Sequence, residues 1–464
     1  MNPVTERICI IGCGYVGLTT GLHLSDSEGT EVSFIEKNAE RLTSLAEGKL
    51  PITEPGLEEL FVEGTGRLKF YESLSNAPEI FDQIYVCVGT PSTEDGISLA
   101  QITEACRDID AWIHEKNIKD LLIIVRSTII PGSTRSLFSD VACKHAEDRN
   151  IEIVYNPEFL REGAALSDIR NAGRNLYGTH DGRRCKRFEE KVREPIVTTW
   201  ETAEFSKYYS NIFYVSLMSY SNEMARIAER LPFHVDMTAV VEQHLLDKRF
   251  SKAPASDLRN DTTSSVASYL VPSFGYGGSC FPKDSYAFFK GMSDFLSEES
   301  ALLSAFIKGN STDAAARVSA VLKSARKLGA CRPAMLGLTF KPGTTDLRNS
   351  PAMTYLEHLV TMFKGNKILL HDPMDRYIDK GFIDKFDDSA VEFAPLGKIL
   401  EWADFVSITT AWEDYKDIDI ADYENVRVVV DAKSLLGKTQ IIKLEKAGVC
   451  YFAPGRVTEP CRDV

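Results

Sequence analysis

The sequence lacks an excess of basic residues and any long apolar run. Its 67 aspartates and glutamates outnumber its 53 lysines and arginines, for a formal net charge of −14, which argues against the basic surface of a nucleic-acid-binding protein. No stretch approaches the roughly 18 consecutive apolar residues of a membrane-spanning helix. The N-terminal apolar segment runs into a glycine motif rather than a cleavage site, so we expect a cytoplasmic protein with neither a signal peptide nor a membrane partner.

Closely spaced cysteine pairs are also missing. The ten cysteines are scattered, and none has the C-x-x-C spacing of a zinc or redox motif, so we expect no metal site. Cys9 and Cys87 lie in apolar, strand-like runs, where cysteine behaves as a small buried hydrophobe. Cys280 differs, because it follows three glycines in FGYGGSCFPKD, residues 274–284. A glycine-rich loop suits close approach of a ligand better than a core position, which leaves attack on a substrate as the role for this thiol.

Short β-branched runs alternate with helical segments in the first third of the chain. These runs cover residues 7–12, 31–36, 84–88, 121–128 and 151–155. Similar runs return after Gly329, at residues 333–338, 367–371, 405–409 and 426–431. Such alternation predicts parallel sheets with helices on both faces.

The middle of the chain is predicted to be mostly helical. Residues 202–229 contain neither glycine nor proline and predict one long connecting helix. A second helical stretch is expected over residues 284–328, and residues 251–268 are polar enough to form an inserted loop. We therefore predict an α/β protein with two Rossmann-like doubly wound domains joined by a helical domain. The expected boundaries are 1–200, 201–328 and 329–464.

The segment GCGYVG, residues 12–17, fits the G-x-G-x-x-G pattern of dinucleotide-binding turns. It directly follows a strand-like run and can continue into a helix. Gly12 permits the tight turn, Gly14 lets the backbone approach a pyrophosphate, and Gly17 allows close packing of helix and strand. The context makes this motif a strong predictor of dinucleotide binding.

Glu36 ends the next predicted strand and indicates which dinucleotide binds. Its carboxylate would accept hydrogen bonds from the adenosine ribose hydroxyls and repel a 2′-phosphate, so NAD is favoured over NADP. Lys37 and Arg41 lie nearby and weaken this preference. The turns 89–91 and 127–128 follow two further strands and are expected near the nicotinamide, although each alone could be an ordinary turn.

Eight segments in the same order make the chain similar to the UDP-glucose/GDP-mannose dehydrogenase family. They are GCGYVG, PITEPGLEEL (51–60), VGTPS (88–92), RSTIIPG (126–132), NPEFLREG (156–163), EFSKYYSN (204–211), GYGGSCFPKD (275–284) and GLTFKPGTTDLRNSP (337–351). The resemblance implies a four-electron oxidation of a nucleotide sugar's C6 alcohol to a carboxylate, with reduction of two NAD. UDP-glucose is the favoured substrate, with GDP-mannose, another UDP-hexose or an N-acetylated UDP-hexosamine as alternatives. A two-electron β-hydroxyacid dehydrogenase is the competing enzyme class.

The resemblance also implies residue roles. Cys280 would be the nucleophile, forming a thiohemiacetal and then a thioester, and Lys207 would stabilise oxyanions. Asn211, Asp284 and Thr128 would position the reacting oxygen or water, and Glu158 would be the general base. The implied cofactor-binding residues are Gly12, Gly14, Tyr15, Val16, Gly17, Glu36, Arg41, Gly89, Thr90, Pro91, Ser127, Thr128, Glu162, Lys283 and Arg348. The implied substrate-binding residues are Glu158, Phe159, Leu160, Arg161, Glu162, Lys207, Asn211, Arg249, Tyr276, Gly277, Gly278, Phe340 and Lys341.

Two departures from the family pattern concern the substrate end. Arg249 is the best match to an arginine that crosses from a neighbouring subunit, but the long insert makes Arg259 a rival. Asp431-Ala432-Lys433 replaces the usual D-G-R motif, and lysine cannot reproduce a bidentate arginine contact. The resemblance and the long helix together imply a homodimer or a larger homo-oligomer.

Overall fold

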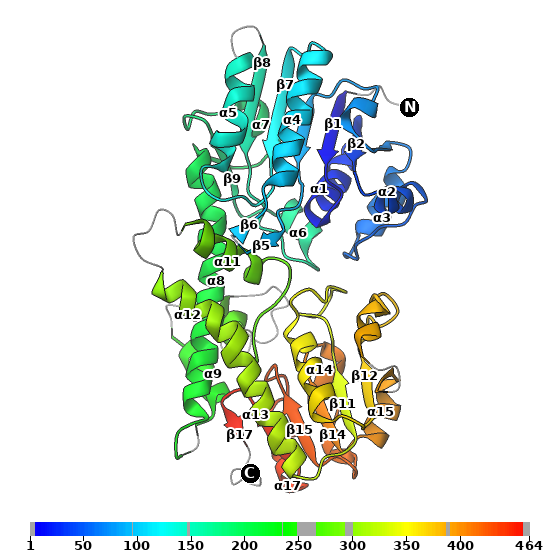
Figure 1. Ribbon diagram of the computed structural model, residues 1–464, viewed down its shortest axis with the longest axis vertical. Helices are drawn as coiled ribbons and strands as arrows, with labels where there is room; N and C mark the ends of the chain where they lie inside the picture. Colours follow the sequence, from blue (N-terminus) through cyan, green and yellow to red (C-terminus); the bar gives the residue numbers. More distant parts are fainter. Residues whose placement is uncertain are drawn as a thin grey trace. The chain divides into compact units, whose positions relative to one another are not determined.

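The computed structural model describes residues 5–94, 96–145, 149–233, 235–247, 266–292, 300–386 and 390–457. The chain divides into two compact units. The first contains residues 1–210 and 287–297, and the second contains residues 211–286 and 298–464. Each is built around one sheet (Figure 1). The predicted boundaries of three domains stay a prediction.

The sheet of the first unit has eight strands in the order β10-β9-β8-β7-β4-β1-β2-β3. The strands are β1 (Glu6–Ile11), β2 (Thr30–Ile35), β3 (Leu68–Tyr71), β4 (Gln83–Val86), β7 (Asp120–Val125), β8 (Asn150–Tyr155), β9 (Asn175–Thr179) and β10 (Pro195–Thr199). All adjacent pairs are parallel except β8 with β9. The order reverses between β1 and β4, which is the point where doubly wound sheets bind ligands.

Alternating side chains of these strands pack against helices on both faces of the sheet. Cys9 and Ile11 face a core shared with α4 (Ala100–Glu115) and α5 (Ser133–His145), whereas Ile8 and Ile10 face α1 and α3. The remaining helices of the unit are α1 (Tyr15–Ser25), α2 (Ala39–Ala46), α3 (Leu57–Gly64), α6 (Ala165–Arg170) and α7 (Lys186–Glu189), and a small hairpin pairs β5 (Ser92–Thr93) with β6 (Gly96–Ile97). Burial on both faces explains why these strands are almost wholly apolar.

The long helix predicted over residues 202–229 is α8 (Trp200–Ala228). The second predicted helical stretch, residues 284–328, is divided into several helical elements. The described residues form α11 (Phe281–Gly291), α12 (Ala301–Lys308), a π-helical turn (Gly309–Asp313) and α13 (Ala314–Lys327). Further helical elements are α9 (Met237–Leu245) and a 3₁₀ turn (Val266–Leu270). Ser300 caps α12 by accepting a hydrogen bond from the Leu303 amide, which starts a new helix inside the predicted stretch.

The sheet of the second unit repeats the Rossmann strand order, as β13-β12-β11-β14-β15-β16-β17. Its strands are β11 (Pro333–Leu336), β12 (Ile368–His371), β13 (Val391–Phe393), β14 (Phe405–Ile408), β15 (Val428–Asp431), β16 (Cys450–Ala453) and an antiparallel β17 (Arg456–Val457). Helices α13 and α14 (Pro351–Met362) cover one face, and α15 (Leu396–Trp402) and α17 (Lys438–Lys446) cover the other. A short α16 (Glu413–Lys416) precedes β15. The predicted fold class is therefore confirmed.

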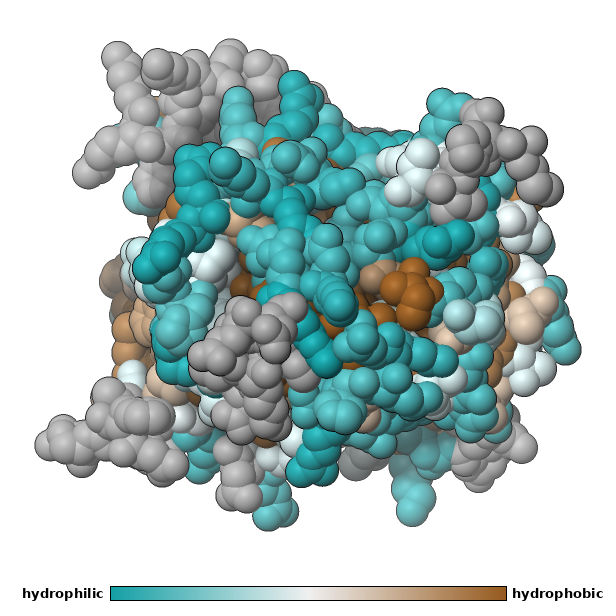
Figure 2. Space-filling view, turned by 90° about the horizontal axis from the view of Figure 1, so that it is seen from above, coloured by the Kyte–Doolittle hydropathy of each residue, from teal (hydrophilic) through white to brown (hydrophobic). Residues whose placement is uncertain are grey.

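The surface shown in Figure 2 is mainly hydrophilic, with a small apolar patch near its centre. Within the described ranges, no helix combines the length and apolarity needed to cross a membrane.

Candidate active site

The glycine motif forms the turn from β1 into α1. Gly12 has a φ of +98°, and a Cβ there would lie 2.8 Å from the carbonyl oxygen of Cys87. A Cβ at Gly17 would lie 1.9 Å from the carbonyl oxygen of Gly12, so both positions require glycine. A Cβ at Gly14 would meet no described atom within 4 Å. This open space before the first turn of α1 fits the pyrophosphate of a dinucleotide.

Glu36 lies directly after β2 and faces the same turn. Its carboxylate accepts hydrogen bonds from the amides of Cys13 and Asn38, at 3.2 and 2.8 Å. The two nearby cations are both occupied. Arg41 forms an ion pair with Glu36 at 3.1 Å, and Lys37 pairs with Glu104 and Asp108 on α4. Neither is therefore free to bind a 2′-phosphate without first losing an acidic partner.

The two turns predicted near the nicotinamide are bonded to each other. The Thr90 hydroxyl donates to the carbonyl oxygen of Thr128 at 2.9 Å. The Ser127 hydroxyl donates to the carbonyl oxygen of Val88 at 2.8 Å. The turns 89–91 and 127–128 thus form one layer beyond β4 and β7, at the carboxyl edge expected for ligand binding.

Glu158 and Lys207 form a buried ion pair in the first unit. The Lys207 ammonium donates to Glu158 Oε1 at 2.7 Å and to the Glu158 carbonyl oxygen at 2.8 Å. Burial alone would raise the pKa of Glu158, but Lys207, the Leu160 amide and Arg126 together lower it below its ordinary value. The carboxylate is thus held ionised, as a general base requires.

The loop between β8 and α6 carries the other predicted residues of this unit. Two cations lie near the Phe159 ring, with the Arg174 guanidinium 3.5 Å and the Lys207 ammonium 5.6 Å from its centroid. The guanidinium of Arg161 forms a fork with Asp168, so this side chain is tied to α6. Glu162 lies near Tyr15 of the glycine motif and helps to raise the pKa of that phenol.

Cys280 immediately precedes α11 in the second unit. Its carbonyl oxygen accepts the first helical hydrogen bond, from the Asp284 amide at 2.7 Å, so Cys280 occupies the N-cap position. The thiol is exposed and not in a disulfide. A helix N-terminus favours negative charge and therefore the thiolate, which is the nucleophilic form of cysteine.

Asp284 lies one turn into α11 and is 1% exposed. It accepts hydrogen bonds from the Asn211 amide nitrogen and the Lys283 ammonium, both at 2.6 Å. Asn211 follows Lys207 by one turn of α8, so the two side chains point from the same side of that helix. The structure thus brings together Asn211 and Asp284, two residues that were predicted separately as site residues. Lys283, predicted to contact the cofactor, is ion-paired with Asp284.

The glycines before Cys280 are packed against the chain itself. A Cβ at Gly277 would lie 2.3 Å from the Asn349 carbonyl oxygen, and one at Gly278 would lie 2.8 Å from the Phe340 ring. The Gly278 amide also donates to the Arg348 carbonyl oxygen at 3.1 Å. These glycines are thus required for contact with the segment 340–349, a reason that the sequence did not reveal.

Other predicted substrate or cofactor residues are distributed around this loop. The Tyr276 side chain packs into a small core with Val215 and Phe306. The Arg348 guanidinium forms a fork with Asp346, donating from Nε to Oδ1 and from Nη2 to Oδ2. The Lys341 ammonium lies 5.6 Å from the centroid of the neighbouring Phe340 ring.

Lys433 follows β15, and burial lowers its pKa to about 8. Arg249 and Arg259 lie outside the described residues.

Two positions that the sequence did not single out hold the site's loops. Asn310, in the π-helical turn, accepts from the Tyr276 amide at 2.7 Å and donates to the Tyr276 carbonyl oxygen at 2.9 Å. Glu54, within PITEPGLEEL, is bonded to residues of the glycine motif and of the 156–163 loop. The sequence carries no signal for Asn310. The structure does, because Asn310 lies in a π-helical turn, and such turns recur at functional sites.

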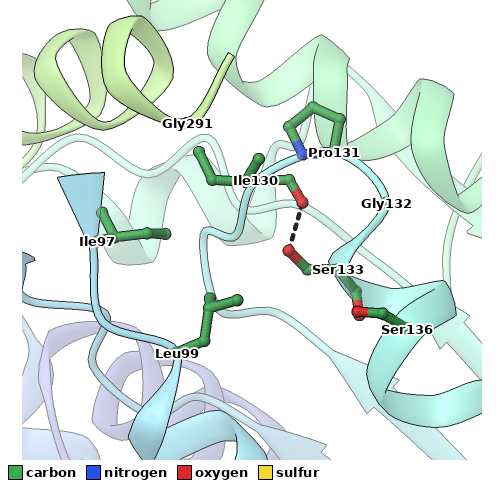
Figure 3. A pocket seen from close by; sticks show the side chains of 8 residues that line it. All are labelled: Ile97, Leu99, Ile130, Pro131, Gly132, Ser133, Ser136 and Gly291. Carbon is green, nitrogen blue, oxygen red and sulfur yellow. Dashed lines mark hydrogen bonds between the residues drawn. The ribbon is translucent and has the colours of Figure 1, made fainter. Parts of the chain in front are cut away.

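A pocket of about 370 Å³ lies beside the loop that follows β7 (Figure 3). Its lining is Ile97, Leu99, Ile130, Pro131, Gly132, Ser133, Ser136 and Gly291. Buried Glu204 accepts hydrogen bonds from the amide of Gly132, which lines this pocket, and from the amide and hydroxyl of Thr134. Burial raises the pKa of Glu204 to about 7. In the described part of the chain, no cluster of three or more histidine, cysteine, aspartate or glutamate side chains is arranged to bind a metal ion.

Family models cover most of the chain in the expected order. The NAD binding domain of the UDP-glucose/GDP-mannose dehydrogenase family matches residues 6–196, its central domain matches residues 201–312, and its UDP binding domain matches residues 334–438. The chain belongs to the UDP-glucose/GDP-mannose dehydrogenase family. The resemblance predicted from sequence is confirmed, and the family's NAD binding domain establishes NAD as the cofactor.

Relatives within the UDP-glucose/GDP-mannose dehydrogenase family span several substrates. UDP-glucose 6-dehydrogenase YwqF of Bacillus subtilis is 32% identical over 462 residues, covering 97% of this chain and 98% of that protein. GDP-mannose 6-dehydrogenase of Azotobacter vinelandii is 32% identical over 381 residues, covering 80% and 82%. The solved UDP-glucose dehydrogenase of Pyrobaculum islandicum is 29% identical, with a TM-score of 0.76 and coverage of 96% and 97%. The protein is thus an NAD-dependent nucleotide-sugar dehydrogenase.

Proposed function

We propose that the protein oxidises the C6 alcohol of UDP-glucose to a carboxylate, with Cys280 as the covalent nucleophile. The observation that carries this proposal is the exposed, unbridged Cys280 thiol at the N-terminus of α11, one turn before the buried Asp284–Asn211 pair. A two-electron β-hydroxyacid dehydrogenase has no need of such a thiol, because it stops at the carbonyl.

The chemistry needs the cysteine only after the first oxidation. The alcohol carbon loses a hydride and its oxygen a proton, giving an aldehyde. The Cys280 thiolate adds to the aldehyde carbon, and the oxygen takes up a proton to form a thiohemiacetal. Loss of a second hydride and of the hydroxyl proton gives a thioester, and water then breaks the C–S bond to release the acid and the thiol. Two NAD molecules bound in succession would each accept one hydride.

The other proposed roles follow from position and charge. Lys207 would stabilise the oxyanion that develops when sulfur or water adds to the carbonyl carbon. Glu158, ionised beside Lys207, would take the proton of the hydrolytic water. Asn211 and Asp284 would orient the reacting oxygen or that water, and Thr128 would contact it from the turn after β7. The proposal assigns both clusters to one reaction on the basis of family membership.

The choice of UDP-glucose rests on the named relatives, several of which act on this sugar nucleotide and cover nearly the whole chain. GDP-mannose is the second candidate, since a GDP-mannose 6-dehydrogenase is equally identical over a shorter span. The UDP binding domain matched by residues 334–438 favours the uridine nucleotide.

The test combines substrate range, stoichiometry and one variant. We expect UDP-glucose to give the highest kcat/KM in a panel of nucleotide sugars, and two NADH per molecule of sugar. Cys280→Ser should lose acid formation by at least ~1,000-fold while NAD binding persists. Cys331→Ser is the matched control, because Cys331 is also exposed and unbridged. One NADH per sugar, or normal acid formation by Cys280→Ser, would contradict the mechanism.

We also propose that the protein is a homodimer that pairs through α8. Large apolar side chains on this helix are exposed at positions that recur on one face, namely Phe213, Tyr220, Met224 and Ile227. Analytical ultracentrifugation should show a dimer, and Tyr220→Glu should shift the equilibrium to the monomer. A monomeric natural protein at micromolar concentration would contradict this proposal.

A further inference from the structure

Glu54 is a buried carboxylate with no role in the proposed chemistry. It lies in the segment between α2 and α3 and is 6% exposed. Burying a charge is costly unless hydrogen bonds or opposite charges compensate for it. The hydrogen bonds that compensate for the burial of Glu54 therefore show which segments this side chain holds in place.

Three donors converge on this carboxylate. The Tyr15 hydroxyl donates to Glu54 Oε2. The amides of Gly163 and Ala165 donate to Oε2 and Oε1, each at 2.7 Å. Tyr15 is the first residue of α1, in the glycine motif, whereas Gly163 ends the loop that carries Glu158. One side chain thus joins two segments that are about 150 residues apart in sequence.

The local chain has no substitute for these bonds. The N-cap of α6 is Ala164, which has no side-chain acceptor for the unpaired amides at the start of this helix. Glu54 supplies that acceptor from another part of the chain. The Tyr15 hydroxyl also lies 3.4 Å from the Arg161 carbonyl oxygen, a second contact with the same loop. In keeping with these bonds, α1 packs against both α3 and α6 (Figure 1).

The electrostatics keep this junction intact near neutral pH. Burial, followed by the hydrogen bond to Glu54 and its charge, raises the pKa of Tyr15 far above the ordinary phenol value. The Tyr15 phenol therefore stays protonated near neutral pH and can donate its hydrogen bond to Glu54. The opposite end of the loop is held separately, by the bonds of Glu158 to Lys207 and to the Leu160 amide.

We propose that Glu54 is a positioning residue that couples NAD binding to the placement of the 156–163 loop. NAD binds where α1 begins, beside Tyr15. When NAD fixes the position of Tyr15, the hydrogen bonds of Glu54 also fix the positions of the Gly163 and Ala165 amides. The loop then presents Glu158 in one position. This inference rests on the family's NAD site and, for Glu158, on the proposed function.

Glu54→Gln is the decisive variant, because it keeps the size of the side chain but replaces one acceptor oxygen with an NH₂ group. That group opposes an amide donor, so at least one of the three bonds is lost. Glu58→Gln is the matched control, since Glu58 lies four residues further along the chain, in the first turn of α3, and is exposed. Calorimetric titration with NAD and hydrogen exchange of the NAD-free protein are measured for both. Neither measurement needs a sugar or Cys280, so failure of the proposed function would not affect this test.

We expect Glu54→Gln to weaken NAD binding by at least tenfold and to speed exchange of the Gly163 and Ala165 amides. Glu58→Gln should match the natural protein in both. Unchanged NAD affinity with only a lower melting temperature would show a purely structural role and overturn the proposal. Weaker binding without faster exchange would also overturn it, because the loop would then not be coupled to Glu54.

Tyr15→Phe provides a second, milder test and serves alone if Glu54→Gln does not fold. It deletes only the hydroxyl and leaves both amide bonds to Glu54 in place. We expect weaker NAD binding and faster loop exchange, and non-additive effects when both variants are combined. The coupling would be overturned if Tyr15→Phe left both NAD affinity and loop exchange unchanged. It would also be overturned if the effects of Tyr15→Phe and Glu54→Gln were additive in the double variant.

Discussion

Asn310 offers a direct test of how the loop before Cys280 is held. Its side chain makes two hydrogen bonds to the backbone of Tyr276, as acceptor at 2.7 Å and as donor at 2.9 Å. Tyr276 is buried, and it precedes the nucleophile by four residues. Asn310→Ala removes both partners and leaves the amide and carbonyl of Tyr276 unsatisfied.

The magnitude follows from the number of groups affected. An unsatisfied buried polar group costs roughly 1–3 kcal/mol, so the loss of both predicts a loop destabilised by roughly 2–6 kcal/mol. If the productive loop conformation is depleted by the same free energy, the lower limit corresponds to a rate roughly 30-fold slower. The bonds of Gly278 to the segment 348–349 remain, so we expect a misplaced loop in a folded protein.

The assay measures initial rates of NADH formation and the rate at which iodoacetamide alkylates Cys280, followed by peptide mass spectrometry. Ser311→Ala is the control, because Ser311 lies in the same π-helical turn and is exposed. We expect Asn310→Ala to be slower in turnover by at least 30-fold and altered in its alkylation rate. Turnover and alkylation within twofold of the natural protein would refute the reasoning.

Three further predictions concern charge. The raised pKa of Glu204, about 7 against an ordinary 4.5, means that the folded chain keeps a proton which the unfolded chain loses between these pH values. The free energy of unfolding should therefore fall by roughly 3 kcal/mol as pH rises through this window. Between pH 5 and 8 the melting temperature should decline less in Glu204→Gln than in the natural protein. Equal slopes of melting temperature against pH in the two proteins would contradict this. Lys433, with its pKa lowered to about 8, should lose its charge above pH 8. The KM for the nucleotide sugar should then rise in the natural protein but not in Lys433→Arg, because arginine stays charged. Finally, kcat/KM for NADP should be roughly 100-fold or more below that for NAD, and Glu36→Gln should narrow the difference; a natural preference for NADP would exclude the assigned role of Glu36.

Local patterns determined much of the fold and the cofactor site. The buried parallel strands are continuous apolar runs, and each predicted strand lies within a few residues of an observed one, because burial on both faces leaves an unambiguous signal. The glycine motif was equally clear, since the φ of Gly12 and the close approach at Gly17 admit no side chain. The residue types of Cys280, Lys207 and Glu158 pointed to their chemistry through the family resemblance, and their roles stay predictions.

The resemblance named both Asn211 and Asp284 as site residues, but it did not predict their hydrogen bond, because 73 residues separate them in sequence. The sequence did not reveal the break in the stretch 284–328, where one helical pattern hides a cap at Ser300 and a π-helical turn. Short strands such as β13 and β17 were missed because they contain too few residues to show a period.

What only the tertiary structure decided is which side chains hold the loops of the site. Glu54 and Asn310 have no local pattern, because their partners are backbone groups, and a backbone amide or carbonyl leaves no mark on the sequence. The same holds for Gly277 and Gly278, whose lack of a side chain is required by a segment some 70 residues further along the chain. The sequence supplied the candidate groups for the chemistry, and the fold determined which backbone groups hold their loops, since hydrogen bonds to distant backbone exist only once the chain has folded.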